Sequence, residues 1–116
     1  MPAPATPTGF QEAAADGTTN STTEVTLVAA PGANATRTVK ILTVFNADTA
    51  SGTFTLRYKS AANTRVLEKR TLAPNESYIY EGPLHLDATN KSLTIILAAA
   101  VAANQMDWTV HYAEIT

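Results

Sequence analysis

The chain has 116 residues, enough for one domain with a real apolar core, and its lack of cysteine excludes disulfides and thiolate metal sites. Its formal net charge of -2, with 16% charged residues, argues against a nucleic-acid binder, because such a protein needs a basic face to neutralise phosphates.

The beginning of the chain shows no targeting pattern. Met1–Gln11 has neither a basic n-region nor an apolar h-region, so we expect no signal peptide. The longest apolar run, Leu93–Ala103, is shorter than the roughly 20 residues that a helix needs to cross a bilayer. We therefore expect a soluble protein that is made in the cytoplasm and has no membrane partner.

Residues 1–22 differ in composition from the rest of the chain. Proline and glycine recur there, and neither strand-like nor helix-like periodicity is visible. The sequence therefore predicts an extended N-terminal arm over residues 1–22 and a single domain over residues 23–116. Two interpretations of the arm remain open. It is a frayed terminus, or it packs on a neighbouring subunit with its one aromatic residue, Phe10, as the anchor.

Strand patterns follow the arm. The first, Val25–Ala29, alternates so that Val25, Leu27 and Ala29 share one face. After a proline-glycine turn, Thr36–Asn46 is predicted to be a long strand. Its middle is apolar on both faces, which indicates a central strand that is covered on both sides.

The clearest alternation lies in Thr53–Lys59, where Phe54, Leu56 and Tyr58 point one way and polar residues point the other. A polar turn then leads into Arg65–Leu72, so the two segments are predicted to form a hairpin. Charged residues in the second segment are typical of an edge strand, where charge discourages unwanted pairing.

The second half of the chain continues this pattern. Ser77–Glu81 is a short strand that Gly82-Pro83 must break or bulge, because proline cannot donate to a strand ladder. Leu93–Leu97 alternates again, and Met106–Ile115 is predicted to be the last strand. Between them, the alanine-rich segment Ala98–Gln105 is either about two turns of helix or a loop over one end of the domain.

About seven strands thus recur at the short, regular spacing that is typical of antiparallel sandwiches. The fold class is predicted to be all-β, an antiparallel β-sandwich resembling a jelly roll. Five side chains are predicted to be buried between its two sheets: Phe54, Leu56, Ile95, Trp108 and Val110.

No set of residues suggests catalysis or cofactor binding. His85 and His111 are predicted to face away from the core, and Asp107 lies about 13 Å from His111 along one strand, too far for a dyad. The loop Asp87–Asn90 could help to hold a cation, but a single aspartate is weak support. We therefore expect no enzyme, with no catalytic, cofactor-binding or metal-binding residues.

Cationic residues gather in the predicted hairpin, and two interpretations remain open. They form a patch that docks on an acidic partner, or they form a solvated face on which charge keeps the edge strand from pairing with another chain. The residues are Arg57, Lys59, Arg65, Lys69 and Arg70.

Four aromatic residues also permit two interpretations. Tyr78, Tyr80, Trp108 and Tyr112 could stack on sugar rings, or their spacing along strands could place them in the core. The spacing favours the core.

Several segments resemble a recurring pattern in the small virion structural proteins of tailed bacteriophages and prophages. Thr71–Tyr78 (TLAPNESY), followed by Gly82–Leu86 (GPLHL), carries this resemblance. Ser92–Ala98 running into Asp107–Ile115 is similar to the same group, as is the apolar strand that ends in a turn over Ile41–Asp48.

The resemblance covers about residues 36–116, while the arm matches no pattern. It implies a compact β-sandwich that binds the major capsid protein or other virion proteins. The first expectation is a capsid decoration or cement protein located in the virion, acting as a homo-oligomer and preferably a trimer. Phe10 and the five cationic residues would then be assembly residues. The alternatives are a tail or fibre component and a carbohydrate-binding module.

Overall fold

The computed structural model describes residues 10–60, 63–87 and 91–115. These residues form strands and no helix. The strands are β1 (Gln11–Thr19), β2 (Val25–Val28), β3 (Thr36–Asn46), β4 (Gly52–Lys59), β5 (Thr64–Leu72), β6 (Ser77–Asp87), β7 (Ser92–Leu97) and β8 (Met106–Ile115). A helix with the length and apolar character that a bilayer crossing demands is absent from this part of the chain.

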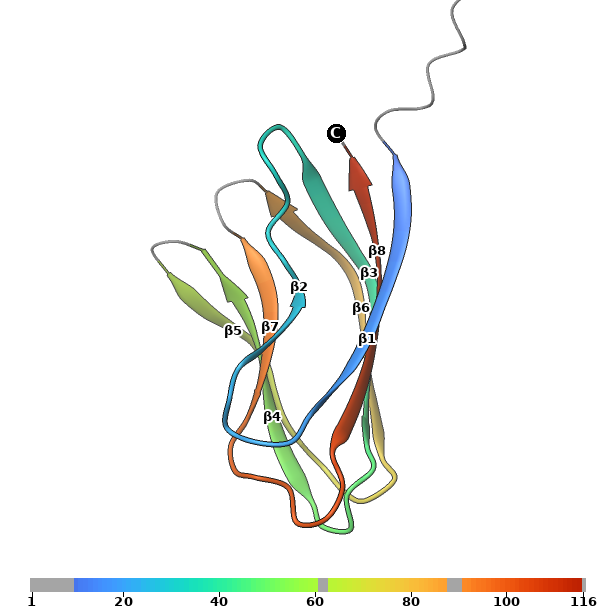
Figure 1. Cartoon of the computed structure of the whole chain (residues 1–116), viewed down its shortest axis with the longest axis vertical. Helices are drawn as coiled ribbons and strands as arrows, with labels where there is room; N and C mark the ends of the chain where they lie inside the picture. The colour runs from blue at the N-terminus through green and yellow to red at the C-terminus, as the bar shows by residue number, and fades with distance from the viewer. Residues whose placement is uncertain (1–9, 61–62, 88–90, 116) are drawn as a thin grey trace, which may run out of the picture.

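The strands pair into two antiparallel four-stranded sheets, in the orders β1-β8-β3-β6 and β2-β7-β4-β5. In Figure 1 the first sheet forms one layer and the second forms the other. Successive strands β1, β2 and β3 alternate between the layers, as in the interleaved Greek keys of a jelly roll. The predicted sandwich is confirmed. The interior position of β3, the β4–β5 hairpin and the edge position of β5 are also as predicted. The prediction that β3 is covered on both sides is wrong, because Ile41, Thr43 and Phe45 on its outer face are only half-buried.

The strand that the sequence did not predict is β1, which spans Gln11–Thr19 and pairs with β8 along its whole length. The prediction that this stretch forms an arm apart from the sandwich is therefore wrong. Its inward residues are small, so no apolar alternation is visible in the sequence. At Gly17 the reason is Trp108, because a Cβ added there would lie 2.7 Å from Cζ2 of that ring. Residues 1–9 of the predicted arm lie outside the described residues.

The apolar core lies between the two sheets, as predicted. Phe54, Leu56, Ile95 and Val110 have no exposed surface, and Trp108 keeps only 6% of its surface exposed. Other buried members come from six of the strands: Leu27, Val28, Val39, Leu42, Val44, Leu72, Leu86, Leu93, Leu97 and Met106.

The Gly82-Pro83 pair bulges the sheet rather than ending the strand. β6 continues through this pair, whose peptide bond is cis, and the register against β3 shifts between Val39 and Ile41. A Cβ at Gly82 would lie 2.1 Å from the carbonyl oxygen of Val39, so only glycine allows this backbone approach.

The short strand β2 departs from the predicted alternation. Leu27 and Val28 are both buried, Ala29 is exposed, and the register against β7 shifts between Thr26 and Val28. The irregularity turns two neighbouring side chains to the same side, which simple alternation does not anticipate.

Ala98–Gln105 is a loop, so the helical alternative is wrong. The buried carboxylate of Asp48 holds it, because this carboxylate accepts the backbone N–H groups of Ala102, Ala103 and Asn104. The alanine-rich segment is thus a loop at one end of the sandwich that is held in place by hydrogen bonds to Asp48.

Candidate assembly surface

The outer faces of the two sheets carry opposite charge. The outer face of β1-β8-β3-β6, here called the acidic face, carries five carboxylates and one lysine: Glu12, Asp16, Glu81, Asp87, Asp107 and Lys40. The Asp87 carboxylate is paired with Lys91. The outer face of β2-β7-β4-β5, here called the basic face, carries three cations and one carboxylate: Arg57, Lys59, Lys69 and Glu24.

Strand alternation places the carboxylates on the acidic face. Asp107 lies between the buried residues Met106 and Trp108, so its side chain points outward. Glu81 is exposed and pairs across the sheet with Ile41. These groups come from β8 and β6, far apart in sequence, and only strand pairing brings them to one face.

At one end of the acidic face lies the terminal cluster, defined as Phe10, Glu12, Lys40 and Ile115. Because Gln11 pairs with Glu114, Phe10 lies beside Ile115 one step further along the ladder. These two side chains are 55% and 48% exposed. Two large apolar groups therefore meet solvent side by side.

Lys40 ties this cluster together. Its Nζ lies 5.7 Å from the centroid of the Phe10 ring and donates to Oε1 of Glu12. This hydrogen bond, with the positive charge of Lys40, lowers the pKa of the Glu12 carboxyl group. The ring of Phe10 is thus oriented by its own subunit, while more than half of its surface stays exposed.

A second apolar area lies at the β6 edge of the acidic face. Ile79 is 54% exposed and pairs with Thr43 on β3. The half-buried residues Ile41 and Phe45 lie diagonally beside it. On the basic face, the large exposed apolar residue within the described part of the chain is Val66, at 61% exposed.

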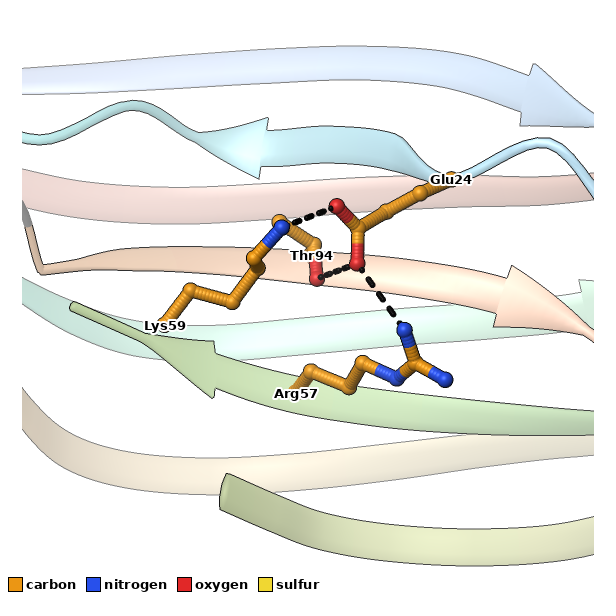
Figure 2. A network of polar contacts seen from close by, with 4 residues as sticks. All are labelled: Glu24, Arg57, Lys59 and Thr94. Atoms are coloured by element: carbon orange, nitrogen blue, oxygen red, sulfur yellow. Dashed lines mark hydrogen bonds and ion pairs between the residues drawn. The ribbon is translucent and has the colours of Figure 1, made fainter. Parts of the chain in front are cut away.

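A polar network organises the basic face (Figure 2). The Glu24 carboxylate accepts hydrogen bonds from Lys59 Nζ at 2.7 Å, from Thr94 Oγ1 at 3.1 Å and from Arg57 Nη1 at 3.3 Å. The hydrogen bond from Lys59 is the largest cause of the lowered pKa of Glu24. One carboxylate is shared by two cations, so the network remains net positive.

The five predicted cations do lie on one hairpin, but they do not form one patch. Lys69 pairs with Thr55 and therefore shares the basic face with Arg57 and Lys59. In contrast, Arg70 pairs with the core residue Phe54 and so points to the inner side of the hairpin.

Arg70 is also held within its own subunit. Its guanidinium lies 4.8 Å from the centroid of the Tyr78 ring and pairs with Glu68 at 3.5 Å. Arg65 pairs with Tyr58, which packs against the core, and so it also belongs to the inner side. Phe10 lies on the other sheet, so the structure does not bring it together with these cations.

The histidines take up the predicted outward positions. His85 and His111 are exposed, and Nδ1 of His85 lies 2.9 Å from Oγ1 of Thr38. Among the described residues, no group of three or more histidine, aspartate or glutamate side chains could hold a metal ion. Three residues of the proposed cation loop, 88–90, lie outside the described residues, and Asp87 pairs with Lys91.

The aromatic residues belong to the core rather than to a sugar-stacking surface. Trp108 is buried, and Tyr78, Tyr80 and Tyr112 are partly buried against the core cluster. The sequence-based preference for the core is confirmed.

Residues that the sequence interpretation missed include Asp16, Ile79, Glu81 and Ile115. A signal was present for Ile79, because it lies between two tyrosines that alternate inward. Asp16 and Glu81 gave no such signal, since they join one surface only through the pairing of β1, β8, β3 and β6.

Comparisons with known proteins support the fold. One chain in the structure of infectious bursal disease virus (Gx strain) superposes with a TM-score of 0.58 at 11% identity, over 91% of this chain and 33% of that one. A chain in the acid-stable capsid of Helicobacter pylori bacteriophage KHP30 gives 0.53 at 14% identity, over 93% and 88%. A chain of the Bacillus endospore appendages, described as disulfide-linked pili, gives 0.53 at 16% identity, over 92% and 86%.

No family model matches the chain, and no curated protein matches its sequence. At these identities the structural likenesses establish an antiparallel sandwich that is shared with capsid and appendage proteins.

Proposed function

We propose that the protein is a non-enzymatic virion structural protein of a tailed bacteriophage, and that it decorates the capsid. It attaches to the outside of the assembled shell as a homo-oligomer, with a trimer as the proposed state, and acts as a cement. The likeness to a chain of the KHP30 capsid, most of whose length is covered, supports this proposal.

The observation that carries the proposal is the terminal cluster. Phe10 and Ile115 expose large apolar surfaces side by side, with the charged pair Glu12–Lys40 at their border. An exposed apolar patch with a polar rim is typical of a protein-binding surface. We propose that the Phe10 ring enters an apolar pocket of a shell subunit.

Binding energy would come from burial of apolar surface, at about 25 cal/mol per Å². Two side chains give a modest contribution for one copy. An oligomer presents several clusters to a symmetric shell, and multivalent attachment raises the apparent affinity by factors of about 10²–10⁴. Small contacts repeated over many copies can therefore resist expansion of the shell.

The test is co-sedimentation of the purified protein with emptied, expanded capsids of the phage whose major capsid gene neighbours this gene. We expect saturable binding and a higher temperature of capsid disruption. Purified tails from the same phage serve as the comparison. Binding to tails without binding to capsids would contradict the decoration role.

The pilus likeness favours a second candidate, a tail or fibre component, because subunits of such a structure also join in series. The disulfide linkage described for the endospore pili is not possible here, since this chain has no cysteine. A fibre of this chain would therefore need non-covalent contacts between copies.

A further inference from the structure

The two outer faces are complementary to each other in charge. The acidic face has an excess of carboxylates, and Asp16 and Glu81 are exposed with no ion pair recorded among the described residues. The basic face has an excess of cations around the Glu24 network, and Lys69 is exposed beside it.

The two faces cannot meet within one molecule. They are the outer surfaces of two sheets whose inner surfaces pack together, so the whole core separates them. Contact between an acidic face and a basic face therefore requires two copies of the chain.

Both faces also expose apolar side chains. Ile79 lies on β6, at one edge of the acidic face, and Val66 lies next to Arg57 on β5, at one edge of the basic face. A contact that includes these edges would bury the two apolar groups beside opposite charges, Glu81 of one copy and Arg57 of the other.

We propose that the acidic partner of the basic face is the acidic face of a second copy of this chain. This inference rests on the homo-oligomer of the proposed function and names the surfaces that join it. The contact uses Asp16, Ile79 and Glu81 of the acidic face. Ile115 pairs with Thr36 and Ile79 pairs with Thr43, so Phe10 and Ile115 lie about six residues, or roughly 20 Å, from Ile79 along the strands and stay available for the shell.

Such a contact is heterologous, because each copy uses two different surfaces. Because the two faces lie on opposite sides of the sandwich, successive copies stack one on another and continue as an open series. This serial association is the arrangement of the second candidate function, the tail or fibre component, rather than of a closed trimer.

The expected strength follows from the size of the faces. The strands of the smaller, basic face have 4, 6, 8 and 9 residues. At a strand spacing of about 4.8 Å they present roughly 400 Å². Stable specific interfaces bury about 800 Å² per partner. We therefore expect association that depends on concentration in solution.

The experiment is sedimentation velocity of the full chain over a range of protein and salt concentrations. Two charge-reversal variants are compared with it. In the first, Asp16→Lys with Glu81→Lys makes the acidic face net positive. In the second, Lys69→Glu with Val66→Glu makes the basic face net negative. All four positions are exposed, and circular dichroism with urea unfolding checks that both variants fold.

We expect the wild-type chain to self-associate. Its association constant should fall at least about tenfold when salt is raised from about 0.05 M to about 0.5 M. For each variant alone, the association constant should be at least about tenfold lower than for the wild type. An equimolar mixture of the two variants should associate again, because every copy then meets a face of opposite charge.

A wild-type chain that stays monomeric at low salt and high concentration would overturn the inference. So would a mixture of folded variants that fails to associate. Capsid binding is measured in parallel. Binding of a monomer to capsids would reject this inference alone, whereas self-association without capsid binding would reject the decoration role alone.

Discussion

The carboxylate of Asp48 accepts the backbone N–H of Ala102 at 2.7 Å, although the two residues are 54 positions apart in the chain. Ala103 and Asn104 donate to the same carboxylate at 2.8 and 3.1 Å. One side chain at the end of β3 thus replaces regular strand pairing for the loop that leads into β8.

These backbone hydrogen bonds lower the pKa of Asp48 from 3.8 to about 2. The folded state therefore favours the ionised carboxylate, and this stabilisation is fully present above pH 3.8. It is lost as pH falls from 3.8 through about 2, below which the group is protonated in the folded state as well.

We expect Asp48→Asn to lower the thermal unfolding midpoint at neutral pH. The difference from wild type should shrink as pH falls through this window. The exposed Asp16→Asn serves as the control and should leave the midpoint unchanged. A difference between Asp48→Asn and wild type that persists undiminished at pH 2 would contradict the charge-based explanation.

The core makes a separate prediction. Leu56 has no exposed surface and lies between the sheets, so Leu56→Ala removes packed apolar volume and should cost about 2–5 kcal/mol in the free energy of unfolding. Urea titration measures this loss. The exposed Val66→Ala on the paired strand is the control and should change stability by no more than about 0.5 kcal/mol.

The fold could be predicted to the extent that large apolar residues alternate with polar ones. Thr36–Asn46 and Met106–Ile115 were predicted with the bounds that the structure shows. The first is a long run with an apolar middle, and the second alternates with large inward residues. The strand Gln11–Thr19 was not predicted, because its inward residues are small. The need for glycine at position 17 depends on Trp108, which lies in a strand distant in sequence.

The candidate site could be predicted only in part. The hairpin cations were identified because they are close in sequence, and Phe10 because it is the lone aromatic residue of its segment. The division of the cations between two faces depends on pairing and on the shift between Leu56 and Arg57. The neighbour of Phe10, Ile115, comes from the other end of the chain, and no local pattern joins them.

The packing of β1 on Trp108 leads to a prediction about Gly17. Gly17→Ala places a methyl group against the Trp108 ring, so β1 must move away from β8 or the ring must shift. We expect a loss of about 1–3 kcal/mol, typical of overpacking, in urea unfolding.

The control for this substitution is Ala14→Ser, at an exposed position of the same strand, which should be nearly neutral. Equal stability of Gly17→Ala and wild type would show that β1 does not press on the tryptophan ring in solution.

The last prediction concerns attachment to the particle. Phe10 is 55% exposed and contacts Lys40 at the end of β1, so Phe10→Ala should change the free energy of unfolding by no more than about 0.5 kcal/mol. If the ring occupies an apolar pocket of the shell, its loss should weaken capsid binding at least about tenfold, as for a buried aromatic anchor. Co-sedimentation with expanded capsids measures this change.

The control is Asn104→Ala, in the exposed loop after β7, which should bind capsids as the wild type does. Self-association in the absence of capsids should be the same for Phe10→Ala as for wild type, because the proposed contact between copies uses Asp16, Ile79 and Glu81 and not Phe10. Unchanged capsid affinity of a folded Phe10→Ala variant would exclude the terminal cluster as the docking surface.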